Sequence, residues 1–203
     1  MKTSPQNEKI DLVFVMDRSG SMSGSEDDTI GGFNSFIQKE IKKELDTRVT
    51  TVLFDDRYEM LYKRKPIHEV DKLTENEYWV RGCTALLDAI GKTINTLDRE
   101  IDNKVLFVIM TDGMENASRE YSKDQIRNLI GNHDWEFIYI GADIDSYAEA
   151  NKIGIARSRV ANYKKSSKGF EDLYCSVSDA TDCLRRDVDL GKGKWSKKLR
   201  KYD

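Results

Sequence analysis

Short apolar runs and segments with apolar residues at helical spacing alternate along this chain. The runs at 12–16, 104–110 and 136–140 are almost entirely apolar, which is typical of strands buried on both faces of a parallel sheet. The β-branched segment 48–54 predicts another strand, and 58–62 predicts its hairpin partner at the sheet edge. Apolar spacing predicts helices at 33–45, 85–97, 122–130, 146–152 and 170–184, with a weaker strand near 155–160.

This alternation predicts an α/β fold with a Rossmann-like, open and mostly parallel sheet, one antiparallel edge strand and helices on both faces. In such sheets, ligands bind outside the carboxyl ends of the strands, where the strand order reverses. A length of 203 residues suits one domain. We expect an N-terminal extension at 1–8, the domain at 9–186 and a basic C-terminal tail at 187–203.

The segment V-F-V-M-D-R-S-G-S-M-S ends the first predicted strand on oxygen donors. Asp17 closes the apolar run, and Ser19 and Ser21 follow at every second position. One carboxylate and two hydroxyls on a single loop suit a hard divalent cation such as Mg²⁺, which prefers oxygen ligands. Because Asp and Ser are also ordinary turn and N-cap residues, the motif gains weight only if other segments supply further ligands.

Two later segments supply such ligands. R-G-C-T-A-L-L-D-A-I places Thr84 at the head of a predicted helix, and K-V-L-F-V-I-M-T-D-G-M ends a buried strand on Asp112 and Gly113. Asp17 and Asp112 therefore both follow the carboxyl ends of predicted strands. The motif and the rule for ligand sites in open sheets indicate the same edge.

This ordered set resembles the metal-ion-dependent adhesion site of von Willebrand factor type A domains, whose pattern is Asp-x-Ser-x-Ser, then Thr, then Asp. The resemblance covers roughly residues 8–186, and the layout looks more like bacterial or phage members than animal adhesion proteins. It implies that Mg²⁺ or Mn²⁺ is held by five matching residues: Asp17, Ser19, Ser21, Thr84 and Asp112.

Within the resemblance, the two serines are expected to be direct ligands and the two aspartates to act directly or through waters. Thr84 is expected to coordinate only in a ligand-bound state. Hydroxyl ligands neutralise little of the ion's charge, and Mg²⁺ readily takes an oxygen from a partner. The implied function is a metal-dependent protein-binding module whose partner completes the coordination with Asp or Glu. Gly113, Glu115 and Asn116 are candidates for the rim of this site, with an ordinary surface loop as the alternative.

Two other functions remain open at this point. Cytosolic members of the family often partner with an AAA+ ATPase or belong to stress-response complexes, which would make this chain an adaptor subunit. A Mg²⁺ hydrolase is the second alternative, since a metal with an open position can polarise a phosphoryl or carbonyl oxygen. The segment G-A-D-I-D superficially resembles a phosphatase nucleophile, but no suitable Lys and acidic pair follow on further strands. The only histidines, His68 and His133, are expected at the surface, away from the site, so neither would act there as a base. An enzyme is therefore not expected.

Charge and composition indicate which classes of partner are expected and which are not. The formal net charge of −3 argues against general nucleic-acid binding. Residues 185–203 contain eight Lys or Arg and three Asp, so an acidic body carries a basic tail. That tail suits contact with an acidic surface, its own or a partner's, although a solvated, frayed terminus is the simpler expectation. The sequence shows no signal segment and no apolar run of the roughly 20 residues that span a bilayer, which predicts a cytoplasmic protein without membrane contact.

Overall fold

The computed structural model describes residues 9–192 and 194–203, so the predicted N-terminal extension lies outside the described residues. Its strands form one sheet in the order β3-β2-β1-β4-β5-β6. β3 pairs antiparallel with β2, and all other neighbours are parallel, which confirms the predicted fold class. The strands are β1 (Ile10–Asp17), β2 (Thr47–Phe54), β3 (Tyr58–Pro66), β4 (Lys104–Thr111), β5 (Glu136–Gly141) and β6 (Val160–Asn162).

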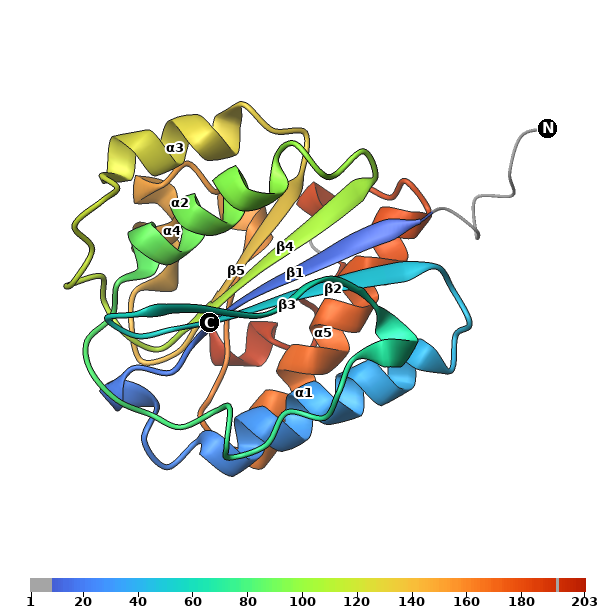
Figure 1. Cartoon of the computed structure of the whole chain (residues 1–203), viewed down its shortest axis with the longest axis horizontal. Helices are drawn as coiled ribbons and strands as arrows, with labels where there is room; N and C mark the ends of the chain where they lie inside the picture. Colours follow the sequence, from blue (N-terminus) through green and yellow to red (C-terminus); the bar gives the residue numbers. More distant parts are fainter. Residues whose placement is uncertain (1–8, 193) are drawn as a thin grey trace.

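Helices cover both faces of the sheet (Figure 1). α1 and α5 lie on one face, and α2, α3 and α4 lie on the other. None of the helices in the described part of the chain has the length and apolar character needed to cross a membrane. The helices are α1 (Glu26–Ile41), α2 (Leu86–Leu97), α3 (Lys123–Gly131), α4 (Ser146–Lys152) and α5 (Ser167–Arg185).

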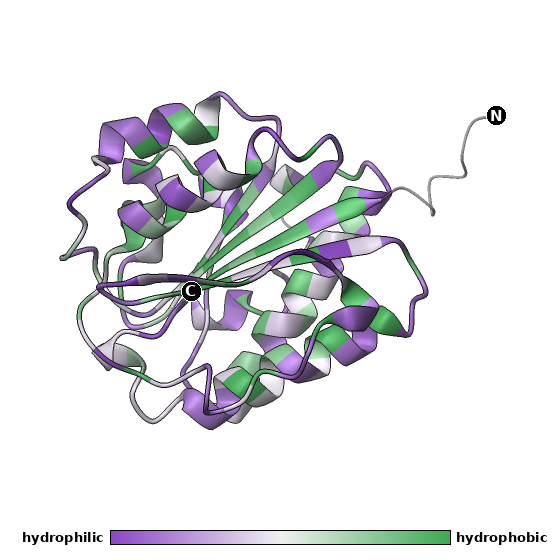
Figure 2. Cartoon of the chain, in the orientation of Figure 1, coloured by the Kyte–Doolittle hydropathy of each residue, from purple (hydrophilic) through white to green (hydrophobic). Residues whose placement is uncertain are grey.

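The central strands are buried on both sides, as their continuous apolar runs predict. In β1, Phe14 packs into the core beneath α1 and α5, whereas Val13 and Val15 face the core beneath α2 and α3. This alternation follows from the two-residue period of a strand. Figure 2 shows the result as central strands that are hydrophobic along most of their length, between helices with polar outer faces.

The last strand lies later in the chain than the sequence pattern predicts. β6 covers only Val160–Asn162, and residues 157–159 form a 3-10 turn. Ile155 is buried, but its backbone N–H donates to Ala150 O at the end of α4. The apolar character of this segment therefore reflects packing against α4 rather than a ladder of strand hydrogen bonds.

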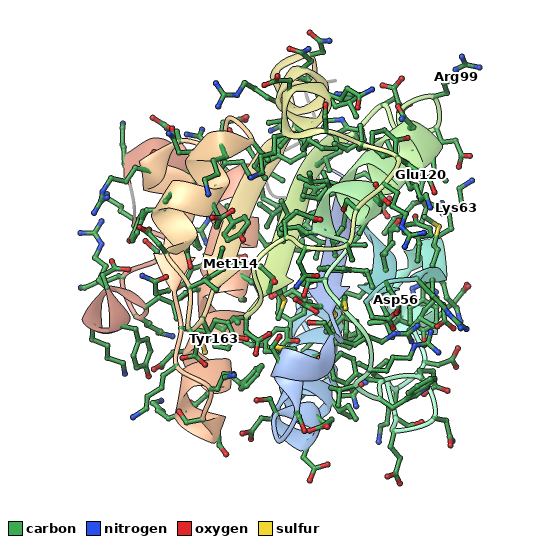
Figure 3. The ribbon with its side chains drawn as sticks, turned by 90° about the vertical axis from the view of Figure 1, so that its left-hand side faces the viewer. Asp56, Lys63, Arg99, Met114, Glu120 and Tyr163 are labelled. Carbon is green, nitrogen blue, oxygen red and sulfur yellow. The ribbon has the colours of Figure 1, made fainter. Side chains whose placement is uncertain are left out.

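The order of the strands fixes where a ligand site can form. The chain proceeds from β1 through β2 to β3 on one side of the sheet, and from β4 through β5 to β6 on the other. The reversal therefore lies between β1 and β4, which pair in register with Met16 opposite Met110. Figure 3 looks onto the carboxyl edge of the sheet, where Asp56, Met114 and Tyr163 follow β2, β4 and β6.

The basic tail is folded onto the domain, so the expectation of a frayed terminus is wrong. Leu190, Trp195 and Leu199 are at most 1% exposed, and the Trp195 indole N–H donates to Ser158 O at 3.2 Å. We call these three apolar side chains the anchors of the tail. Exposed lysines surround them in the sequence, so the segment reads as polar and its apolar contacts are not predicted. The alternative, contact with the chain's own acidic groups, holds for Lys201, whose ammonium lies 2.7 Å from Asp172.

Removing the aromatic anchor of the tail should destabilise the whole domain. We expect Trp195→Ala to lower the free energy of unfolding by about 3–5 kcal/mol, because a large buried side chain is replaced by a cavity. Urea denaturation measures this loss. The matched control is Lys197→Ala, an exposed change in the same tail, which should stay within about 0.5 kcal/mol of wild type. Equal stability of the two variants would show that the tail does not pack on the domain in solution.

Candidate functional site

Asp17 is the fixed point of the predicted site. It closes β1, and its carboxylate is only 2% exposed. One carboxylate oxygen accepts from the Ser19 backbone N–H at 2.7 Å, and the other accepts from the Thr111 hydroxyl at 2.5 Å. The Tyr78 hydroxyl donates to the Asp17 carbonyl oxygen at 2.6 Å. The first loop and the end of β4 thus hold the orientation of this carboxylate together.

Three hydroxyls and a second carboxylate continue from Asp17 as one hydrogen-bonded cluster. Ser19 Oγ lies 3.1 Å from Ser21 Oγ, and the Thr84 hydroxyl donates to Ser19 Oγ at 3.0 Å. Ser21 Oγ donates to Asp112 Oδ1 at 2.5 Å. The structure therefore brings together all five predicted residues from three separate segments. Ser21 is exposed and the other four are buried, so the cluster opens to solvent at Ser21.

The residues after β4 hold the Thr84 loop in place. Asn116 Oδ1 accepts from the Thr84 N–H at 2.9 Å, and the Asn116 N–H donates to Thr84 O at 3.0 Å. Glu115 accepts from the Leu87 N–H at the start of α2 at 3.0 Å. These two predicted rim residues thus also position the loop, a role that their place in the sequence does not indicate.

Gly113 packs closely against the hydroxyls of the cluster. A Cβ at this position would lie 2.7 Å from Thr84 Oγ1 and 3.2 Å from Ser21 Oγ. The first distance is shorter than real Cβ contacts, so any side chain here would displace the hydroxyls or fill the site. The lack of a side chain at this point allows the Thr84 and Ser21 hydroxyls to keep their positions in the cluster.

The buried charge of Asp17 is not compensated by the hydrogen bonds around it. Burial raises its pKa to about 6, although hydrogen bonds from Thr111 and Ser19 lower it; the nearby Asp112 charge adds to the rise. A bound cation would favour the ionised form. Within the described residues, no three His, Cys, Asp or Glu side chains are grouped to hold a metal. A metal at this edge would therefore use the hydroxyls as well as the two carboxylates, a donor set that fits a hard divalent ion.

Lys165 also contacts this cluster, although no pattern in the sequence marks it as a site residue. Its ammonium lies 2.9 Å from Asp112 Oδ2 and 2.8 Å from Asp143, and donates to Ser21 O at 3.2 Å. Burial lowers its pKa, but the bonds to Asp143 and Asp112 raise it more, so Lys165 is a cation at neutral pH. Lys165 follows β6 and lies 144 residues after Ser21 in the sequence. The two residues come together because both lie at the carboxyl edge of the sheet.

A second ion cluster, also missed by the sequence analysis, joins the Asp17 loop to the Thr84 loop. Asp55, buried after β2, accepts from Arg18 Nε at 2.9 Å and from Arg81 Nε at 2.8 Å. Arg18 is itself 1% exposed, and the Trp79 ring covers the Arg81 guanidinium at 4.3 Å. Because one arginine adjoins Asp17 and the other precedes Thr84, Asp55 fixes both loops relative to β2.

The histidines take no part in the site. His68 is exposed, as expected. The same expectation is wrong for His133, whose side chain is only 12% exposed, with Nε2 2.8 Å from Asp98 and Nδ1 beside Leu129 O. His133 packs against Trp135 with a ring separation of 4.5 Å, which explains its burial.

Comparisons with known proteins identify the family and the fold of this chain. The family model described as von Willebrand factor type A domain matches residues 11–175. Comparison with curated proteins gave no match. Proximal thread matrix protein 1 from the mussel byssus is similar at 18% identity and a TM-score of 0.69, over 88% of this chain and 47% of that chain. This chain thus spans slightly less than half of the mussel protein's length.

Two further solved structures carry metals. The mussel protein with a zinc-occupied adhesion-site motif matches at 18% identity and a TM-score of 0.58, over 88% of this chain and 46% of its own. The manganese-loaded TRAP protein of Plasmodium vivax matches at 19% identity and a TM-score of 0.57, over 78% of this chain and 70% of its own. At these identities the similarity shows the shared fold.

Loss of the Asp55 carboxylate should destabilise the protein in a pH-dependent way. Asp55→Ala removes the buried partner of Arg18 and leaves the half-exposed Glu59, 2.8 Å from Arg18 Nη2, as its remaining carboxylate partner. We therefore expect a loss of about 3 kcal/mol at pH 7 by urea denaturation, the lower end of the range for a broken buried ion pair. Burial raises the pKa of Asp55, but hydrogen bonds from Arg81, Arg57 and Arg18 outweigh it and lower the net value. A carboxyl whose pKa is lowered by folding stabilises above its unfolded pKa, and this contribution is lost as the pH falls through the folded value.

The difference between wild type and Asp55→Ala should accordingly be full above about pH 4 and shrink below it. An exposed carboxylate that does not take part in this cluster provides the control, since Glu75→Ala should change stability little. A wild-type advantage that is the same at pH 3 and pH 7 would contradict the assignment of this effect to the Asp55 carboxylate.

Proposed function

The chain belongs to the von Willebrand factor type A family, and from this premise we propose that it is a metal-dependent protein-binding module. The observation that carries the proposal is the convergence of two carboxylates and three hydroxyls at the carboxyl edge of the sheet. We assign the metal to this cluster, with ligands Asp17, Ser19, Ser21, Thr84 and Asp112.

The chemistry of the donors supports Mg²⁺ or Mn²⁺ as the resident ion. The cluster offers only carboxylate and hydroxyl oxygens, without the imidazole or thiolate groups that favour softer metals. Ser19 and Ser21 are proposed as direct ligands, and Asp17 and Asp112 as direct or water-mediated ones. Thr84 would join when a partner is bound. The zinc and manganese found in structures of similar fold support a divalent ion here.

The surroundings of the cluster support protein binding rather than catalysis. Because the hydroxyl ligands are neutral, a bound divalent ion would keep much of its charge and attract an Asp or Glu of the partner. Two exposed apolar side chains flank the carboxyl edge of the sheet: Met114 is 61% exposed and Trp79 is 43% exposed. Met114 is labelled in Figure 3. Gly113, Glu115 and Asn116 would complete the rim. Neither histidine lies at the cluster, where a catalytic base would be needed. A cytoplasmic location and an AAA+ ATPase as partner remain predictions.

A divalent ion should stabilise the protein through Asp17. At a free ion concentration of 100 times the dissociation constant, the native state gains about 2.7 kcal/mol. For a domain of this size that corresponds to a rise in melting temperature of roughly 5–10 °C. We expect this shift with Mg²⁺ or Mn²⁺ relative to EDTA in wild type, and none in Asp17→Ala or Asp17→Asn.

The Asn variant keeps the shape of the side chain and separates loss of the ligand charge from loss of packing. Asp134→Asn is the matched control, because Asp134 is an exposed aspartate before β5, at the opposite edge of the sheet. It should keep the full shift. A shift that survives in Asp17→Asn would place the ion elsewhere, and the absence of any shift in wild type would count against a resident metal.

A further inference from the structure

We propose that Lys165 is a tethered cation that competes with the divalent ion for Asp112 and makes tight ion binding depend on an acidic ligand. This inference rests on the proposed metal site. It starts from the juxtaposition of the Lys165 ammonium with Ser21 and Asp112, two of the proposed metal ligands, and with Asp143.

The Lys165 ammonium pairs with Asp112 Oδ2, the carboxylate oxygen that does not accept from Ser21 and that an ion could otherwise bind. Asp112 Oδ1 accepts from Ser21 Oγ at 2.5 Å, and Oδ2 pairs with Lys165 at 2.9 Å. The Asp112 side chain is fully buried, so solvent does little to screen this pair. A divalent ion that enters the cluster must share Asp112 with a positive charge already in place, which lowers the affinity for the ion alone.

The position of Lys165 is set by the fold and is not that of a loose surface side chain. It contacts oxygens from three different loops, those after β1, β4 and β5, and its side chain is only 26% exposed. The Tyr163 N–H donates to Gly141 O at 2.9 Å, which fastens the segment before Lys165 to the end of β5. Figure 3 labels Tyr163 and Met114 at this edge, on the segments that carry Lys165 and Asp112.

Asp143 gives the ammonium a second partner when an ion takes Asp112. Its carboxylate lies 2.8 Å from Lys165 Nζ and is 63% exposed, at the solvent side of the site. Held there, Lys165 can donate to the carboxylate of a bound partner, beside the ion. The same charge that opposes the ion alone would then favour the ion and an acidic ligand together, since a carboxylate near a cation is stabilised.

The test is a calorimetric titration with Mn²⁺ of wild type, Lys165→Met and Lys164→Met, each with and without acetate. Chloride replaces acetate at equal ionic strength. Lys164→Met is the matched control, because it removes the same charge from an exposed neighbour. Without acetate, we expect Lys165→Met to bind Mn²⁺ about tenfold more tightly than wild type, and Lys164→Met to stay within about twofold of wild type. Acetate should raise the affinity of wild type more than that of Lys165→Met.

The outcomes separate this inference from the proposed function. Equal Mn²⁺ affinity in all three proteins, or an equal gain from acetate in wild type and Lys165→Met, would overturn the role of Lys165 while leaving the metal site intact. Binding only in Lys165→Met would support it strongly. No binding in any of the three would overturn the metal site, and this inference with it. Lys165→Gln takes the place of Lys165→Met if the latter does not fold, as judged by circular dichroism.

Discussion

Two carboxylates buried at the ends of neighbouring central strands are the constraint on which the site depends. Asp17 and Asp112 close or follow β1 and β4, which pair directly, so the topology alone places two negative charges together. Burial raises the pKa of Asp17 to about 6, and the charge of Asp112 adds to the rise. The groups around them are donors or cations: the hydroxyls of Thr111 and Ser21, and the ammonium of Lys165. The local structure is organised around this charge.

Asp55 is a third buried carboxylate at the same edge, and its negative charge is balanced by positively charged side chains of the protein. Two guanidinium groups and a backbone N–H face it, and its pKa is lowered despite its burial. Burial raises the pKa of Asp17, and the hydrogen bonds from Thr111 and Ser19, which are neutral donors, do not outweigh that rise. The Asp55 cluster is electrostatically complete and serves as a frame for the loops. The Asp17 cluster has an uncompensated charge and reaches solvent at Ser21, and a carboxyl with a strongly shifted pKa at such a place is a candidate for a binding site.

The sequence predicts the elements well where local pattern and tertiary role agree. Continuous apolar runs indicate the central strands, and the order of strands and helices indicates the open sheet and the edge at which the candidate site residues lie. The failures have a common cause. Asp55 with its arginines, and Lys165 with Asp112, are contacts between segments far apart in the chain, and no periodicity marks them. Trp195 was overlooked because the charge of the tail obscured its apolar anchors, and His133 because its burial depends on packing against Trp135.

If the proposed metal site is occupied, its balance of charge would suit a reversible contact with an acidic partner. Two carboxylates, one ammonium and one divalent ion would together leave a single positive charge, with Asp143 largely screened by solvent. One carboxylate from a partner neutralises that charge. A site with three or four carboxylates would hold its ion alone, and would offer a partner little electrostatic gain. With three hydroxyls among its five proposed ligand residues and Lys165 opposed to the ion, the proposed site would instead reserve part of its binding energy for the partner.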